Sequence, residues 1–199
     1  MDLKVNSGIN FGSEIRFLNE RAFTRNLKGK FIDFHPYEPC IQKANEFYTV
    51  NIRTCTAGGL FDTKNKIFLG FHLLDYIDNM ENIKQIIANM FSQVKNPDKA
   101  FLLGGKALNG NVAPYSMDMF NELKDAFTQR IENLTVFEEH KYPWSETDFH
   151  YNSATDRLDI CSMYRRNQGE NEKYILSKEE LEDCFKSVTI SPDDKLIFK

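Results

Sequence analysis

A cysteine followed at short range by a histidine is the feature of this sequence that most directly predicts chemistry. Cys55 lies in the stretch TVNIRTCTAGG (49–59), and His72 follows it by seventeen positions. A thiol attacks a carbonyl carbon as the thiolate, and a nearby imidazole is the usual base that generates it. The pair therefore predicts a cysteine nucleophile acting on a carbonyl group.

Three short runs around this pair are expected to position it. Residues 47–54 alternate in polarity and are rich in β-branched and aromatic side chains, which is typical of a strand. Residues 58–62 and 67–74 predict two further strands, separated by a polar turn. A short hairpin of this kind puts Cys55 and His72 on neighbouring strands. The last run is strongly apolar, which favours a central place in its sheet.

The rest of the chain adds helices and shorter strands. Apolar residues recur with helical spacing over 79–94 and 116–131, and each pattern predicts a helix with one buried face. Between these helices, 100–103 predicts a buried strand that ends at Gly104 and Gly105. Weaker signals predict strands at 134–138, 149–151, 157–161, 187–190 and 195–198 and a helix at 178–185. The order of elements predicts an α+β class or a layered α-β-β-α arrangement.

Bulk composition narrows the function classes. The chain has 199 residues, of which 41% are hydrophobic and 27% charged, which fits one globular domain spanning 1–199. A net charge of -4 argues against a general nucleic-acid binder. No apolar stretch approaches the roughly 20 residues of a membrane span, and the start lacks the zones of a signal peptide. We expect no membrane insertion and a cytoplasmic location, or export without a cleaved signal peptide.

The cysteines do not suggest a metal site. Cys40, Cys55, Cys161 and Cys184 are far apart and form no CxxC pair, which leaves a structural zinc site unsupported. Two disulfides are conceivable, but thiols in a cytosolic redox setting are the simpler interpretation. We expect neither a metal nor a cofactor.

Each candidate residue also has an ordinary structural interpretation. A cysteine at a strand end is often a small buried hydrophobe. His72 alone fits a neutral, hydrogen-bonded core histidine, and Thr49 is an ordinary strand residue. What favours the chemical interpretation is a family resemblance, which rests on the spacing of the three residues and on the later Gly-Gly turn.

These motifs, taken in order, resemble the CheD family of chemoreceptor glutamine deamidases and its wider group of cysteine deamidases. In that family a strand ends in a cysteine, with a threonine six positions before it and a histidine seventeen after it. Thr49, Cys55 and His72 stand at those offsets. A helix then leads to a strand that runs into a Gly-Gly turn, as 79–94 here leads to Gly104 and Gly105, and a second helix follows.

The resemblance divides the chain into three parts. It covers about residues 45–131, which we expect to form a CheD-like core. Residues 1–45 are then an N-terminal extension, and 132–199 supply strands and a helix that complete the domain. Two departures from the family lie beside the site: Arg53 and Thr54 replace a Gly-Ser pair, and Leu69-Gly70-Phe71 precedes His72. Because residues beside the cysteine line the mouth of the site, these departures bear on the choice of substrate.

The resemblance implies an activity and a role for each residue. Cys55 would attack the side-chain carboxamide of a glutamine in a protein substrate, and His72 would carry the proton to the departing ammonia. Thr49 would orient His72 through its hydroxyl or its backbone carbonyl. Backbone N–H groups at Cys55 and in a 56–59 turn would bind the oxyanion, and Arg53 would lower the pKa of the thiol if it turns toward the sulfur. The thioester would then be hydrolysed to glutamate.

Other functions are compatible with the same residues. An amine in place of water would give transglutamination, and a fold that has lost its chemistry would be a non-catalytic interaction module. The resemblance implies a chemotaxis receptor as substrate, whereas the long additions favour a bacterial effector that modifies a host protein. The partner in either setting is a protein that carries a reactive glutamine.

Overall fold

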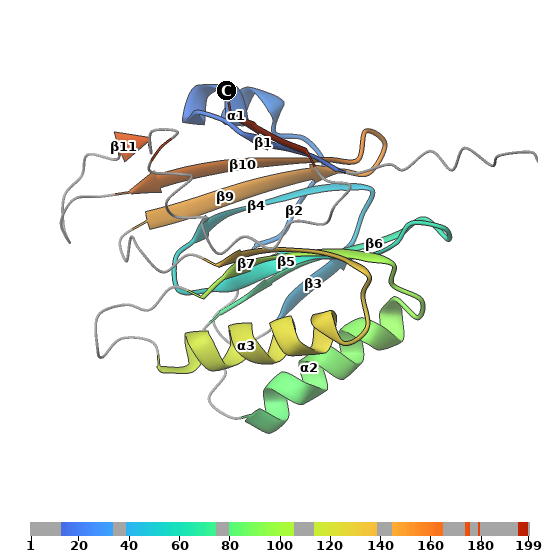
Figure 1. The fold of residues 1–199 in the computed structure, drawn as a ribbon. Coiled ribbons are helices and arrows are strands. Elements are labelled where there is room, and N and C mark those ends of the chain that lie inside the picture. The colour runs from blue at the N-terminus through green and yellow to red at the C-terminus, as the bar shows by residue number, and fades with distance from the viewer. Residues whose placement is uncertain are drawn as a thin grey trace, which may run out of the picture.

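Two β-sheets and three helices make up the described part of this computed structural model (Figure 1). The structure describes residues 13–33, 39–74, 80–105, 114–138, 145–164, 174–175, 179 and 195–198. The described residues contain three helices together with two sheets, so the predicted α+β class is confirmed.

The five-stranded sheet carries the hairpin that the sequence predicts. Its order is β3-β6-β5-β7-β8, and every pair is antiparallel except β7 with β8. Its strands are β3 (Cys40–Lys43), β5 (Thr56–Asp62), β6 (Ile67–Leu73), β7 (Lys99–Gly104) and β8 (Asn133–Glu138). β5 is the central strand, and β6 lies beside it as expected.

The seven-stranded sheet joins the two ends of the chain. Its main path is β12-β1-β10-β9-β4-β2, and β11 pairs with β10 beside it. Its strands are β1 (Glu14–Phe17), β2 (Lys30–Phe31), β4 (Glu46–Ile52), β9 (Ser145–Asn152), β10 (Arg157–Tyr164), β11 (Tyr174–Ile175) and β12 (Lys195–Phe198). β1 runs parallel to both β10 and β12, so a strand near each end of the chain lies in one sheet.

An aromatic core joins the two sheets face to face. The central contact stacks Phe61 of β5 on Tyr151 of β9, with ring centroids 4.4 Å apart and planes 14° apart. Phe47, Phe101 and Phe149 surround this pair with tilted or edge-on contacts. Aromatic pairs add to the hydrophobic gain from burial, so this cluster sets the separation of the sheets.

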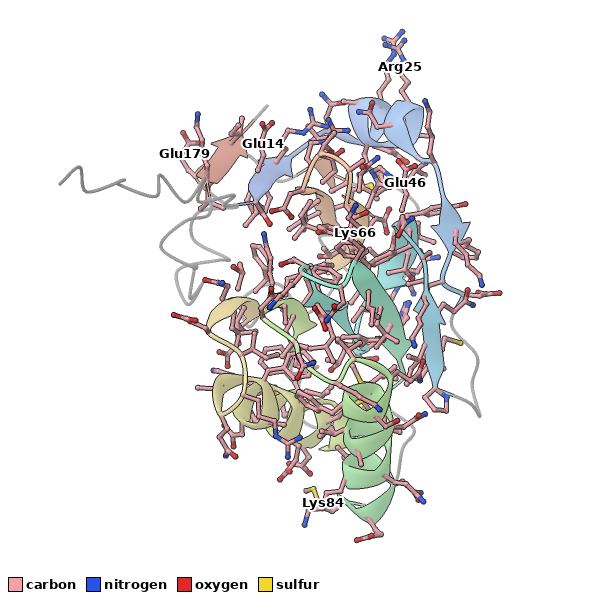
Figure 2. The ribbon with its side chains drawn as sticks, turned by 90° about the vertical axis from the view of Figure 1, so that its right-hand side faces the viewer. Glu14, Arg25, Glu46, Lys66, Lys84 and Glu179 are labelled. Carbon is pink, nitrogen blue, oxygen red and sulfur yellow. The ribbon has the colours of Figure 1, made fainter. Side chains whose placement is uncertain are left out.

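Helices cover the outer faces of both sheets. α2 (Met80–Gln93) and α3 (Pro114–Thr128) lie on the five-stranded sheet, where Leu102 and Phe71 join their apolar faces in a second core. The short α1 (Glu20–Asn26) lies on the seven-stranded sheet, with Phe23 against Cys161 and Met163 of β10. Figure 2 shows the two ends of this stack, with Arg25 of α1 far from Lys84 of α2.

Several elements differ from the sequence expectations. The segment expected as an N-terminal extension contributes β1, α1, β2 and β3, and so supplies strands to both sheets. Strands β9 and β10 are longer than predicted, at eight residues each. The predicted helix at 178–185 and strand at 187–190 lie outside the described residues, apart from 179. Within the described ranges, no helix has the length and apolar character needed to cross a membrane.

Candidate functional site

His72 projects from β6 into the space between the two sheets. Its register partners are Cys40 on β3 and Ala57 on β5, which lie on either side of it in the five-stranded sheet. Opposite residues of antiparallel strands share a face, and Ala57 belongs to the core between the sheets. The imidazole therefore points toward the seven-stranded sheet, and its side chain is only 1% exposed.

Cys55 lies on the same face as His72. It occupies the last position of a bend at 53–55, immediately before β5, and packs into the core between the sheets. Ala57 is opposite His72, and Cys55 precedes Ala57 by two positions, so Cys55 lies near His72 just before the β5–β6 ladder begins. Cys55 is 5% exposed, so the thiol is buried beneath the surface.

Thr49 connects His72 to the opposite sheet. Its hydroxyl lies 2.7 Å from His72 Nδ1 and donates a hydrogen bond to the Ile32 carbonyl, also at 2.7 Å. A carbonyl only accepts, so the single hydroxyl proton goes to Ile32 and Thr49 must accept from Nδ1–H. The neutral imidazole is therefore the Nδ1–H tautomer, and its Nε2 carries the lone pair.

Burial sets the protonation state of His72. It lowers the pKa of the imidazole from 6.5 to about 4, and the negative charge of Asp33 opposes that effect in part. At neutral pH the ring is uncharged and able to accept a proton at Nε2. A neutral ring with a free lone pair at Nε2 is able to accept a proton, and the lowered pKa makes it a weaker base than an ordinary histidine.

Two expected contributors to the site are engaged elsewhere. Arg53 forms an ion pair with Glu146 of β9, whose side chain is 3% exposed, so the guanidinium charge is directed to that carboxylate. The expected turn at 56–59 is instead part of β5, where residues 57–59 pair with both β6 and β7. The prediction of oxyanion donors in such a turn is therefore wrong, because a central strand uses its amides in the ladders.

Glycines allow the backbones around the site to approach closely. Gly104 at the end of β7 lies beside Cys55, and a Cβ there would be 3.2 Å from the Cys55 carbonyl oxygen and 2.9 Å from Phe120. Gly105 follows with a φ of 76°, a conformation that favours glycine. The predicted Gly-Gly turn thus lies next to the candidate nucleophile.

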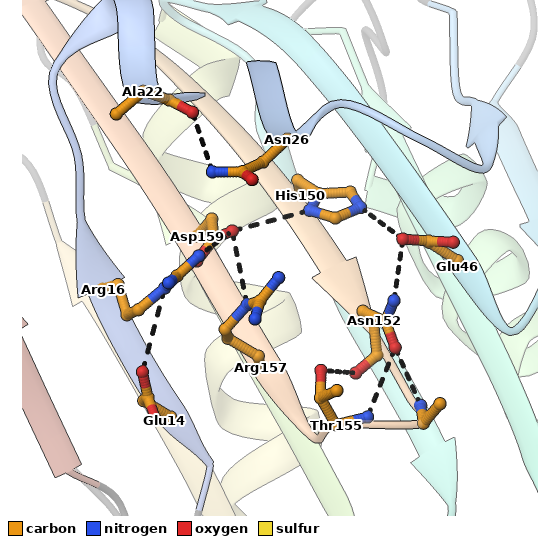
Figure 3. Close-up of polar contacts among 11 residues, drawn as sticks. Glu14, Arg16, Ala22, Asn26, Glu46, His150, Asn152, Thr155, Arg157 and Asp159 are labelled. Atoms are coloured by element: carbon orange, nitrogen blue, oxygen red, sulfur yellow. Dashed lines mark hydrogen bonds and ion pairs between the residues drawn. The ribbon is translucent and has the colours of Figure 1, made fainter. Parts of the chain in front are cut away.

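A second cluster of buried charges lies on the outer face of the seven-stranded sheet (Figure 3). Asp159 is fully buried and accepts two hydrogen bonds from Arg16, at 2.6 and 2.7 Å. His150 lies between Asp159 and Glu46, with Nε2 3.1 Å from the Glu46 carboxylate. Burial alone would raise the pKa of Asp159, but His150, Arg16 and Arg157 outweigh it and hold that pKa below 3.8. This cluster ties together β1, β10, β9 and β4.

Part of the site was not predicted from the sequence. The Ile32 carbonyl and Asp33 lie in the segment expected as an N-terminal extension. No local pattern marks a backbone carbonyl that accepts from a side chain seventeen residues later. Among the described residues, no group of three His, Cys, Asp or Glu side chains is arranged to hold a metal ion.

Two comparisons with known proteins find no match for this chain. A scan against protein-family models finds no match, and a search of curated proteins finds none either. The function therefore has to be argued from the site itself.

Proposed function

We propose that this chain is a protein-glutamine deamidase that acts through a Cys55 thioester. The observation that carries the proposal is the fixed tautomer of His72, whose Nε2 is the basic atom on the face that also holds Cys55. A general base held by a third residue beside a thiol is the arrangement that activates a cysteine nucleophile. The motif resemblance to the CheD family supports the same chemistry.

The proposed reaction has two halves. In the first, the thiol proton moves from Cys55 Sγ to His72 Nε2 while sulfur attacks the carboxamide carbon of the glutamine. The tetrahedral intermediate then collapses, its C–N bond breaks, and ammonia leaves with the proton from Nε2. In the second half, His72 removes a proton from water, the hydroxide cleaves the thioester, and the proton returns to sulfur. The products are a glutamate side chain and the original thiol.

Stabilisation of the oxyanion is assigned to the bend before β5. The amides of 57–59 belong to strand ladders, whereas 53–55 lies outside them and leads directly to the sulfur. Backbone N–H groups aimed at a developing oxyanion are the usual stabilising element in acyl transfer. This stretch includes Arg53 and Thr54, which also distinguish the chain from the family pattern.

The direct test compares two thiols on either side of the same imidazole. Cys55→Ser should abolish ammonia release from a protein substrate, and mass mapping should no longer find the one-mass-unit change of glutamine to glutamate. Cys40→Ser is the matched control, because Cys40 lies opposite His72 on β3 and should be dispensable. Full activity in Cys55→Ser would reject the proposal. Adding a primary amine separates deamidation from transglutamination.

A non-catalytic interaction module is the second candidate, and the burial of the pair favours it. Cys55 and His72 are 5% and 1% exposed, so a glutamine has to enter between the sheets to reach them. In an interaction module, Cys55 would react with a mild thiol probe no faster than Cys40 does. Selective labelling of Cys55 at neutral pH would favour the enzyme.

The CheD-like form of the fold and the biological setting are also part of this proposal. The two stacked sheets with helices on both outer faces are compatible with the layered α-β-β-α arrangement of that family. The additional strands β1, β9, β10 and β12, outside the span of the motif resemblance, favour a substrate other than a chemoreceptor. We therefore favour a bacterial effector acting on a host protein over a chemotaxis deamidase.

A further inference from the structure

Two buried hydroxyls project into the core between the sheets. Thr147 of β9 and Ser162 of β10 are directly opposite each other, and their side-chain oxygens are hydrogen-bonded at 3.0 Å. Thr147 is fully buried and Ser162 is 4% exposed. Thr147 alternates along β9 with Phe149, which belongs to the core between the sheets, so both hydroxyls lie on that face.

Two ring contacts align β9 of one sheet with β5 of the other (Figure 1). Tyr151 stacks on Phe61 of β5, with ring centroids 4.4 Å apart. Two residues closer to the start of β9, the Phe149 ring lies 5.0 Å from that of Phe101 on β7, whose register partner on β5 is Gly59. Residue numbers therefore fall in the same direction along both strands, from 151 to 149 on β9 and from 61 to 59 on β5.

The next two-residue step along both strands brings Thr147 to the candidate nucleophile. This step leads from Phe149 to Thr147 on β9 and to Ala57 on β5, and Cys55 lies a further two positions before Ala57. The pairing within the other sheet agrees, because Thr147 is opposite Ile52 of β4, which comes three positions before Cys55. The two hydroxyls therefore face the end of the inter-sheet core at which Cys55 lies.

We propose that Thr147 and Ser162 bind the side-chain carboxamide of the substrate by accepting hydrogen bonds from its NH2 group. The inference rests on the proposed function and names the residues that select a glutamine at Cys55. A hydroxyl oxygen has two lone pairs, so the single bond between these two oxygens leaves acceptor capacity on both. The deamidated product is a carboxylate without N–H groups, so it loses these bonds.

The residues around the pair explain why hydroxyls at these positions point to a ligand. The neighbouring inward positions are Ile52, Phe149 and Ile160, and all three belong to the apolar core between the sheets. Burying hydroxyls in such a layer costs free energy that valine and alanine would not incur. A site built to hydrogen-bond a substrate N–H group discriminates against a ligand that lacks it, which gives the two hydroxyls a use beyond packing.

The test compares two thiol reagents at Cys55, with peptide mapping to separate it from the other cysteines. Iodoacetamide carries a carboxamide beside the carbon that sulfur attacks, whereas methyl methanethiosulfonate has no N–H group. Thr147→Val keeps the shape of the side chain. It should slow labelling by iodoacetamide about fivefold relative to labelling by methyl methanethiosulfonate, as expected for one lost hydrogen bond. Ser162→Ala should lower the same ratio of rates.

The ratio of the two rates separates recognition from a change in structure. Both reagents need the same thiolate and the same access between the sheets, so a merely structural effect changes both rates together. Thr147→Ser retains the hydroxyl and should keep the wild-type ratio. Thr135→Val removes a buried hydroxyl from β8, which β7 separates from β5, and should also leave the ratio unchanged. A wild-type ratio in both Thr147→Val and Ser162→Ala would overturn the inference.

The inference and the proposed function fail separately, because the labelling rates require neither turnover nor a known substrate. An unchanged ratio in the two variants refutes the carboxamide site even if Cys55→Ser abolishes deamidation. A lowered ratio together with an active Cys55→Ser supports the carboxamide site and refutes only the deamidase proposal.

Discussion

At the scale of single residues, one hydroxyl determines what His72 is able to do. Thr49 accepts from Nδ1–H only because its own proton is already given to Ile32. Without that second bond, the hydroxyl could equally donate to the ring and leave the proton on Nε2, where it would block transfer from sulfur. The proposed role of His72 as a base therefore depends on a backbone carbonyl from a segment far from it in sequence.

Replacing Thr49 by valine tests this dependence. The change keeps the shape but leaves the Ile32 carbonyl and Nδ1–H without their shared partner, so stability should fall by about 1–3 kcal/mol. The tautomer is then no longer fixed, and Cys55 alkylation at pH 7 should fall about tenfold, an effect of about 1.4 kcal/mol. Nitrogen NMR of the His72 ring would report the tautomer directly. Thr49→Ser keeps the hydroxyl and should preserve both properties; a fully reactive Thr49→Val would contradict the assignment.

The sequence was sufficient to select the three candidate residues but not all of their contacts. The resemblance implies that Thr49 orients His72 through its hydroxyl or its backbone carbonyl, and the structure places the hydroxyl 2.7 Å from His72 Nδ1. The bond from the same hydroxyl to the Ile32 carbonyl could not be predicted, because no local pattern encodes how β4 aligns with the segment after β2. The Arg53 side chain illustrates the same limit, since its partner Glu146 lies 93 positions away.

At the scale of elements, strands and helices with strong periodicity were predicted and short ones were not. β5, β6, α2 and α3 have clear apolar patterns, and their bounds lie within a few residues of expectation. β1, β2 and β3 have two to four residues each, too few to show a period. α1 was also missed, because Phe23 is its only buried residue and its start depends on Asn19, whose side chain accepts from the Ala22 amide.

A glycine on β6 controls how closely the elements around the site approach. A Cβ on Gly70 would lie 2.5 Å from the Phe47 ring of β4 and closer still to Ile32 Cδ1. Gly70→Ala should therefore force β4 and the segment after β2 away from β6. Overpacking of this kind is expected to lower the free energy of unfolding by about 1–3 kcal/mol. The same displacement should lengthen the Thr49–His72 bond and slow Cys55 alkylation.

A double-mutant cycle makes the Gly70 prediction specific. Phe47→Leu removes the ring that the new methyl group would meet, at the expense of a cavity. If the steric account is correct, Gly70→Ala should be less destabilising in the Phe47→Leu background, as measured by urea unfolding. Strictly additive effects of the two changes would show that the methyl group is accommodated elsewhere.

At the scale of the whole molecule, the lowered pKa of His72 makes the free energy of unfolding depend on pH. Its pKa is about 4 in the folded chain and near 6.5 when unfolded. Above pH 6.5 both states are neutral and the histidine has no effect. As the pH falls from 6.5 toward 4, the unfolded chain gains a proton that the folded chain does not, so stability declines.

The size of this decline is testable by urea unfolding between pH 7 and pH 4.5. The wild type should lose about 2 kcal/mol more than His72→Asn over that range, from 1.36 kcal/mol per pKa unit. Asparagine does not titrate, and its amide is able to donate to Thr49 as Nδ1 does. Parallel pH profiles for the two proteins would show that His72 is not buried in its neutral form. The pKa of the Asp159 carboxyl is lowered from 3.8, so its contribution to stability is lost only below pH 3.8 and lies outside this window.

The bond between Thr49 and His72 crosses from one sheet to the other, and this has a consequence for when the chain is able to react. Each sheet carries only some of the candidate site residues. β6 and the bend before β5 carry the ring and the sulfur, and β4 of the other sheet carries the hydroxyl that orients the ring. In the proposed mechanism, a folding intermediate in which both sheets have formed but not yet docked lacks the hydroxyl that orients the ring. We therefore expect Cys55 to become reactive toward a thiol probe only when the two sheets dock.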